Sequence, residues 1–126
     1  MKKKKETNNL NIEKSWSFDS AQTITVFGKK YNIHAALMQA ESLEVKELNI
    51  DDLYISYAGF GIDTLRDFIE HVKSVNDADL NYPILMNEDG YIIDGRHRLA
   101  KAIITGEKTI KCKRFISDPS ACYEWV

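Results

Sequence analysis

The most informative stretch of this chain is residues 81–106, with the sequence NYPILMNEDGYIIDGRHRLAKAIITG. Two short apolar runs in it, Ile84-Leu85-Met86 and Tyr91-Ile92-Ile93, have the composition of β-strands. Between them lies Asp89-Gly90, a pair that tolerates the positive φ angles of a two-residue hairpin turn. The first half of the stretch therefore predicts a β-hairpin.

The second half of this stretch has the period of a helix. Apolar side chains recur on one helical face, at Leu99, Ala100, Ala102, Ile103 and Ile104. The helix is predicted to begin near Arg96, with Asp94 or Gly95 as its N-terminal cap. Gly106 is predicted to end it, because glycine readily adopts the left-handed conformation that follows a helix.

The junction between hairpin and helix, Asp94-Gly95-Arg96-His97-Arg98, is the candidate functional site. Amide groups in the first turn of a helix have no partner within it and carry partial positive charge, so they attract anions. Basic side chains in that turn are unfavourable unless they share an anion, and Gly95 would let a ligand approach the backbone. The motif predicts a phosphate pocket. The alternative is that Asp94 only caps the helix and the arginines are solvated.

The side chains of this motif have the chemistry that a phosphate site needs. Arg96 and Arg98 can hold a phosphate through paired hydrogen bonds. His97 can orient the phosphate or transfer a proton, since its charge changes near neutral pH. Asp94 is the nearest carboxylate for catalysis or for a metal ion. Further candidates lie earlier in the chain, at Glu47, Asp51 and Asp52.

Residues 82–115 resemble the core of the ParB/sulfiredoxin-like superfamily, in which a hairpin leads into Asp/Gly-x-His/Arg-Arg at a helix start. A small-residue helix ending at glycine and a final strand then follow. Here the motif is Gly95-Arg96-His97-Arg98, similar to the Gly-Cys-His-Arg of sulfiredoxins. Arg96 stands where sulfiredoxins carry their thiol, so sulfiredoxin activity is not expected. The resemblance covers about a third of the chain directly and extends loosely back to Leu43.

The resemblance implies an α+β fold with a small mixed sheet and helices. It also implies a metal-dependent nucleotide hydrolase or nuclease that uses ATP or CTP and Mg²⁺. Asp94 and His97 would then be catalytic, and Gly95, Arg96, His97 and Arg98 would bind the phosphate. The alternative is a non-catalytic, nucleotide-sensing or DNA-associated module that regulates a partner, such as a phage or plasmid accessory factor. The chain is too short for the additional DNA-binding and dimerisation domains of a partition protein.

The segments before the hairpin alternate between strand and helix patterns. Residues 21–27 predict a strand, residues 28–30 a turn, and residues 31–41 a helix that Asn32 could cap. Residues 43–50 alternate as a strand. Loop 56–61 holds two glycines and two aromatic residues, so it is either a mobile loop that stacks on a base or a turn with core aromatics.

Residues 63–75 predict an amphipathic helix with Asp63 or Thr64 near its cap. Its buried face is expected to hold Leu65, Phe68, Ile69 and Val72. Histidines outside the motif are more typical of packed or surface positions than of a site, which applies to His34 and His71. Residues 109–115 predict a final strand. The basic residues of this region either converge in space or are solvated singly: Arg96, Arg98, Lys101, Lys108, Lys111, Lys113 and Arg114.

Composition sets the class of protein. The 126 residues are 44% hydrophobic and 29% charged, as expected for one globular domain. A net charge of −2 gives no overall basic footprint for nucleic acid. The two cysteines, Cys112 and Cys122, show no metal-type pairing, and Cys112 is expected to be a small apolar filler. Few cysteines favour a reducing, cytoplasmic location over a disulfide framework.

The N-terminal residues form a separate region in the sequence. Residues 1–15 begin with a lysine run and are expected to be a disordered polar tail, whereas residues 16–126 are expected to form the single domain. No membrane span is expected. Apolar side chains recur at even positions, at Leu10, Ile12, Trp16 and Phe18. Trp16 and Phe18 are expected to form a short strand or a lid over the core.

Overall fold

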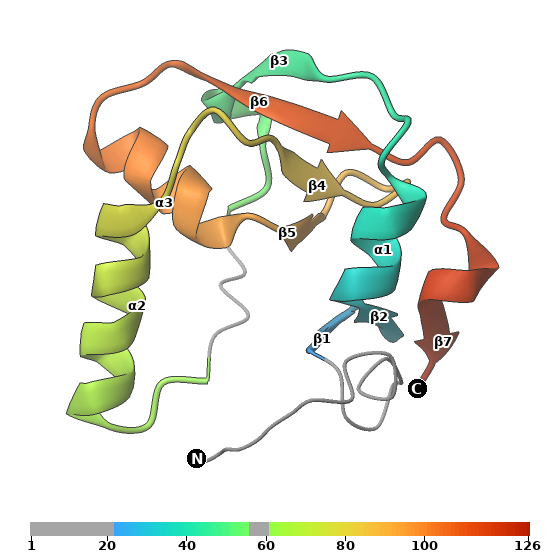
Figure 1. Ribbon diagram of the computed structural model, residues 1–126, viewed down its shortest axis with the longest axis horizontal. Coiled ribbons are helices and arrows are strands. Elements are labelled where there is room, and N and C mark those ends of the chain that lie inside the picture. The colour runs from blue at the N-terminus through green and yellow to red at the C-terminus, as the bar shows by residue number, and fades with distance from the viewer. Residues whose placement is uncertain (1–21, 56–60) are drawn as a thin grey trace.

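The computed structural model describes residues 22–55 and 61–126, and within these residues the fold is α+β, as predicted. Three α-helices accompany seven short strands (Figure 1). The helices are α1 (Ile33–Gln39), α2 (Leu65–Asp77) and α3 (Arg96–Ile104). The strands are β1 (Thr23–Val26), β2 (Lys29–Asn32), β3 (Lys46–Asn49), β4 (Ile84–Met86), β5 (Ile92–Asp94), β6 (Thr109–Arg114) and β7 (Tyr123–Trp125). Two 3₁₀ turns, η2 (Ile50–Asp52) and η3 (Ser120–Cys122), connect them.

The described strands form two sheets. The larger has the order β3-β6-β4-β5 and is mixed, because β6 runs parallel to β4 while the outer pairs are antiparallel. The smaller is antiparallel, with the order β1-β2-β7. Figure 1 shows α2 beside α3 next to the larger sheet, with α1 close to the smaller one. The chain thus returns at its C-terminal end to pair with an N-terminal strand.

The larger sheet is buried on both faces, which explains its continuous apolar runs. Ile84, Met86 and Ile92 pack with Leu99 and Ala102 of α3 on one face. The alternate residues of the same strands point to the opposite face, because side chains alternate along a strand. There they pack with α1 and the smaller sheet, in a cluster that includes Leu85, Ile93, Ala35, Ala36, Tyr31 and Phe115.

The hairpin that leads into α3 has a longer loop than the predicted two-residue turn. The amide of Asn87 donates to the carbonyl of Tyr91 at 2.8 Å, and the amide of Gly90 donates to the carbonyl of Asn87 at 3.0 Å. Asn87 Oδ1 also accepts from the amides of Asp89 and Tyr91, at 3.0 and 2.9 Å. Gly90 has φ 88°, whereas Asp89 does not have a positive φ. The loop therefore ends in one left-handed glycine, and it is not the two-residue turn with positive φ at both positions that Asp89-Gly90 predicts.

Helix α3 begins and ends where the sequence predicts. Gly95 is its N-cap residue, and Gly106 follows its C-cap with φ 82°. The amide of Gly106 donates to the carbonyl of Ile103 at 3.1 Å, and that of Glu107 donates to the carbonyl of Ala102 at 2.8 Å. These two bonds satisfy carbonyls that the helix itself leaves open. Ile104 is exposed, so the buried stripe of α3 is narrower than its sequence predicts.

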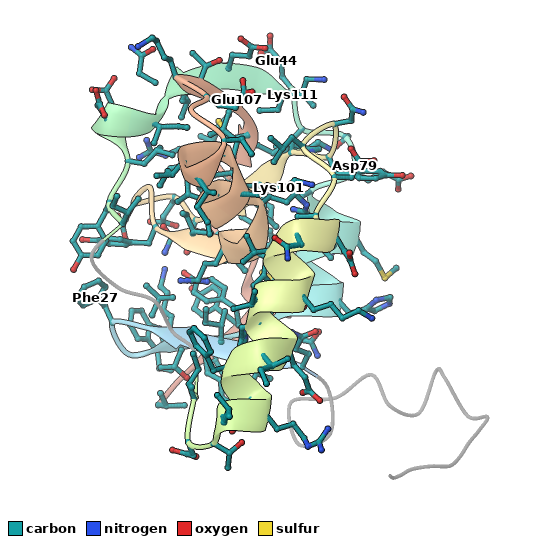
Figure 2. The ribbon with its side chains drawn as sticks, turned by 90° about the vertical axis from the view of Figure 1, so that its left-hand side faces the viewer. Phe27, Glu44, Asp79, Lys101, Glu107 and Lys111 are labelled. Atoms are coloured by element: carbon teal, nitrogen blue, oxygen red, sulfur yellow. The ribbon has the colours of Figure 1, made fainter. Side chains whose placement is uncertain are left out.

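The β1–β2 hairpin lies where the sequence predicts a turn and a helix start. Phe27 and Gly28 both have positive φ, 48° and 86°, and form the turn, so that Lys29 already belongs to β2. Phe27 lies at the tip of this hairpin (Figure 2). Asn32 caps α1 as predicted, with its Oδ1 accepting from the amide of Ala35 at 2.9 Å. The pairing of β2 with β7 stabilises this short strand, and no local pattern reveals such a distant partner.

Helix α2 confirms the predicted helix but not its predicted buried face. Thr64 is the cap, and Asp67 completes a capping box with it. Instead of being buried, the apolar side chains are 41 to 73% exposed: Leu65, Phe68, Ile69 and Val72. The cause is that α2 packs against α3 through another side, on which Asp67, His71 and Val75 are half-buried. Among the described residues, no helix has the length and apolar character needed to cross a membrane.

Candidate functional site

A pocket of about 210 Å³ lies at the N-terminus of α3 and brings the predicted motif together with distant segments. The motif contributes Asp94, Gly95, Arg96 and His97. The remaining lining comes from the residue before β1, from β1, from α1, from the segment before α2, from α2 and from β5: Gln22, Thr23, Ile24, Ile33, Gly61, His71 and Ile93. Four of the five motif residues therefore share one pocket.

The backbone at this pocket has the form of a helix start. Gly95 has φ 108° and ψ 18°, and its carbonyl accepts the first helical bond, from the amide of Leu99 at 2.9 Å. The amides of Arg96, His97 and Arg98 come before this first helical hydrogen bond, so they have no acceptor within the helix. Their partial positive charge, from the aligned peptide dipoles, lies at the pocket wall.

A pair of histidines joins α2 to α3 at this pocket. His71 Nδ1 lies 2.8 Å from His97 Nε2, and the two ring centroids are 5.0 Å apart. In a hydrogen bond of this kind, one ring nitrogen donates a proton and the other accepts it. The contact therefore requires at least one neutral imidazole, because two imidazolium rings would both donate and repel each other.

The surroundings of His97 favour its neutral form. Burial lowers the pKa of His97 below its ordinary value of 6.5, and the charges of His71 and Arg98 lower it further. The nearby Asp94 carboxylate opposes this shift without reversing it. At neutral pH the His97 ring can thus act as an acceptor or donor without adding positive charge to the pocket.

The stability of the fold is expected to decrease as the pH falls below 6.5. Because the pKa of His97 is lower in the folded chain, the unfolded chain binds more protons between 6.5 and that lowered pKa, so acid favours unfolding there. His97→Gln removes this contribution and is expected to flatten the dependence. Urea unfolding at a series of pH values measures it, with His34→Gln at an exposed site as the matched control. Equal slopes for wild type and His97→Gln would contradict this expectation.

Arg98 lies differently from the other motif residues. Its Nη1 donates to the carbonyl of Pro83 at 3.1 Å and lies 3.6 Å from Asp94 Oδ2. Arg98 is not among the described residues that line the pocket, whereas Arg96 is. These contacts tie the start of α3 to the segment before β4. A phosphate in the pocket would therefore meet Arg96 first.

Gly95 is tightly packed by the protein itself. A Cβ atom at this position would lie 2.6 Å from Ile84 Cγ2 and 2.9 Å from Arg98 Nη1. Its φ of 108° also disfavours any L-residue with a side chain. From the sequence, Gly95 was expected to let a ligand approach the backbone. In the structure, the packing of Ile84 and Arg98 and the backbone conformation already require a glycine at this position.

The carboxylates considered for a metal ion lie apart. Asp94 lines the pocket, but Asp51 and Asp52 line another pocket beside Gly106, at the opposite end of α3. Nine helical residues separate the two ends by about 13 Å at 1.5 Å per residue. Glu47 lies on β3, where it accepts from Thr109 Oγ1 at 3.3 Å.

The Mg²⁺ that the resemblance implies stays a prediction. Within residues 22–55 and 61–126, no group of three or more His, Cys, Asp or Glu side chains could hold a metal ion. The pocket's carboxylate, Asp94, is in addition next to the Arg98 guanidinium, at 3.6 Å.

The basic residues near the motif do not form one cluster. Lys101 donates to the carbonyls of Asn76 and Ala78, at 2.9 and 2.7 Å, and so reaches from α3 to the end of α2 (Figure 2). Lys113 donates to the carbonyls of Ala40 and Glu41 at the end of α1. Cations at the C-terminal ends of helices interact favourably with the helix dipole. These lysines therefore stabilise the fold.

His71 was not identified as a site residue from the sequence. His71 is separated from the motif by a loop and two strands, and only the packing of α2 on α3 places it beside His97. Gly61 also lines the pocket, whereas the remainder of the predicted base-stacking loop, residues 56–60, lies outside the described residues. The available signal for His71 was a pair of histidines on neighbouring helices.

Comparison with protein-family models, with curated proteins and with solved structures found no match to this chain. The resemblance to the ParB/sulfiredoxin-like superfamily therefore stays a prediction that rests on the motif and its strand–turn–helix context.

Proposed function

We propose that this chain binds a phosphate group of a nucleotide or a nucleic acid in the pocket at the N-terminus of α3. One observation carries the proposal: the first turn of α3, with the side chains of Arg96 and His97, lines one pocket. Each of these groups can donate a hydrogen bond to a phosphate oxygen. The resemblance of the motif to ParB-like proteins supports the same ligand class.

The size of the pocket limits what it can enclose. A volume of about 210 Å³ is smaller than the roughly 300–1,000 Å³ of sites that enclose a drug-sized ligand. A phosphate group with part of a sugar is the better match, with the base outside the described lining. A neutral His97 then serves as a donor or acceptor that orients the phosphate, while Arg96 supplies the positive charge.

The histidine pair supports a second candidate, phosphate-ester hydrolysis. In that reaction one proton of a water molecule moves to an imidazole nitrogen, the water oxygen bonds to phosphorus, and the ester oxygen leaves. His97, with its pKa below the ordinary value, is the acceptor of that proton in this candidate. Release of inorganic phosphate from ATP or CTP, or cleavage of an oligonucleotide, lost in His97→Gln, would favour hydrolysis over binding alone.

The binding proposal predicts ligand-dependent stabilisation that Arg96 supplies. A nucleoside triphosphate at 100 times its dissociation constant should stabilise the folded chain by about 2.7 kcal/mol. The corresponding nucleoside, which lacks phosphate, should give no shift. Arg96→Gln keeps a polar side chain but removes the charge, and it should weaken the shift. Thermal unfolding with and without Mg²⁺ measures all of these.

A matched control separates the pocket from general charge effects. Lys111→Gln removes one positive charge from β6, and Lys111 is not among the described residues that line the pocket. This variant should retain the full nucleotide shift. Equal shifts for wild type and Arg96→Gln, or none for any phosphate compound, would contradict phosphate binding in this pocket.

A further inference from the structure

Helix α2 carries an apolar face that no described part of the chain covers. Its side chains are 73, 52, 55 and 41% exposed, in the order Leu65, Phe68, Ile69 and Val72. Residues at this spacing lie on one side of a helix. Most helices are stabilised by burying such a face, and contiguous exposed apolar patches mark interaction sites.

Polar contacts hold α2 in place instead. His71 contacts His97 on α3, Lys101 of α3 donates to the carbonyl of Asn76 near the end of α2, and Thr64 with Asp67 caps the start. These contacts fix the helix without using its apolar side. That side is therefore available to another segment.

The chain has a segment that suits this face, and it begins nearby. Residues 1–21 precede Gln22, which lines the α3 pocket together with Gly61 and His71. Gly61 precedes the apolar positions of α2 in the sequence, and His71 lies among them, directly before Val72. The segment therefore joins the described fold within the width of one pocket from α2.

The length of the N-terminal segment also agrees with the length of the apolar stripe on α2. Phe18 and Gln22 are four positions apart, which is about 13 Å in an extended chain. Leu65 lies six helical positions from His71, about 9 Å along the helix axis. The apolar stripe from Leu65 to Val72 covers seven positions of the helix, about 10 Å, which an extended stretch of three residues such as 16–18 matches.

The apolar side chains of the N-terminal segment also suit the apolar stripe of α2. Leu10, Ile12, Trp16 and Phe18 all occupy even positions, so they share one side when that segment is extended. A second copy of the chain is a weaker occupant, because a stable dimer buries about 800 Å² per partner. A single narrow stripe on one short helix offers little of that area.

We propose that residues 16–18 dock on the apolar face of α2 within the same chain, with Trp16 and Phe18 against Phe68 and Val72. This inference is independent of the proposed phosphate site. Docking would bury the apolar stripe and tie the N-terminal segment beside the pocket.

Trp16 is a built-in probe of this docking. The chain has two tryptophans, so Trp125→Phe leaves Trp16 as the single one. Excited selectively, Trp16 should emit at shorter wavelength and be quenched by acrylamide severalfold less in the folded chain than in urea. Adding Phe68→Asp and Val72→Asp should restore quenching toward the value in urea. Ser74→Asp, which places one aspartate at an exposed position off the apolar stripe, should leave Trp16 protected.

Each outcome decides the proposal. Far-UV circular dichroism verifies that the aspartate variants stay folded, as expected for exposed positions. Full quenching of Trp16 in the folded parent chain, or protection that the α2 variants do not change, would overturn it. Protection that disappears on dilution, with a dimeric mass by light scattering, would assign the face to a second copy and also overturn it.

Discussion

Asp118→Ala is expected to lower the free energy of unfolding by about 3–5 kcal/mol, the range for removing one partner of a buried ion pair. Asp118 Oδ2 accepts from Lys29 Nζ at 2.9 Å and from the Tyr31 hydroxyl at 2.7 Å. Its Oδ1 accepts from the amide of Glu88 at 2.9 Å. Asp118 and Lys29 are only 7 and 9% exposed, so water cannot replace the lost acceptor. Urea unfolding measures the loss.

This network joins the smaller sheet to the hairpin that precedes α3. Asn87 Nδ2 donates to the Tyr31 hydroxyl at 3.0 Å, and the amide of Asp118 donates to Glu88 Oε1 at 2.7 Å. Burial lowers the pKa of Lys29, but the hydrogen bond and charge of Asp118, with Glu88 and Tyr123, raise it overall above 10.5. The ion-pair contribution is thus present at neutral pH, and on the alkaline side it is lost as the pH rises above 10.5 through the raised pKa.

Two controls test whether the charge pair causes the loss. Asp51→Ala removes an exposed carboxylate and should change stability by less than about 0.5 kcal/mol. Lys29→Met combined with Asp118→Leu removes both charges and should be less destabilising than Asp118→Ala alone. A loss for Asp118→Ala no larger than that for Asp51→Ala would contradict the role of this network.

Gly95→Ala is expected to destabilise the fold by about 2–6 kcal/mol, the sum of backbone strain of roughly 1–3 kcal/mol and overpacking of roughly 1–3 kcal/mol. The strain comes from φ 108°, and the overpacking from the 2.6 Å approach to Ile84 Cγ2. Ile84 is fully buried, so it cannot move aside readily. Urea unfolding measures the change.

Two other glycines separate these causes. Gly106 has φ 82° with no atom within 4 Å of the added Cβ, so Gly106→Ala should show only strain, about 1–2 kcal/mol. Gly61 has neither positive φ nor a neighbour within 4 Å, although it lines the same pocket as Gly95, so Gly61→Ala should be near neutral. Equal effects at the three positions would contradict the packing of Gly95 described above.

Elements with a strong local signal were predictable from the sequence. The apolar runs of β4 and β5, the cap at Gly95 and the terminator Gly106 depend on neighbouring residues only, and each lies where expected. The α+β class follows from the same local patterns. Cys112, expected to be an apolar filler, is 2% exposed.

Features that depend on distant partners were not predictable. β2 is a strand because it pairs with β7, far away in the sequence, and the periodicity of α2 gave no hint that α3 would pack on its polar side. The Lys29–Asp118 pair joins residues 89 positions apart. Periodicity identifies which face of a helix is apolar, but it cannot identify the segment that covers that face.

The most direct test of the phosphate pocket is to follow backbone amide resonances by NMR while titrating the chain with inorganic pyrophosphate. We expect the amide signals of Arg96 and His97 to shift most, with saturation, because these two residues line the pocket. Arg96→Gln should weaken the apparent affinity. Shifts confined to the lysines of the β6 strand and the N-terminal tail, with the α3 amides unmoved, would contradict phosphate binding at the start of α3.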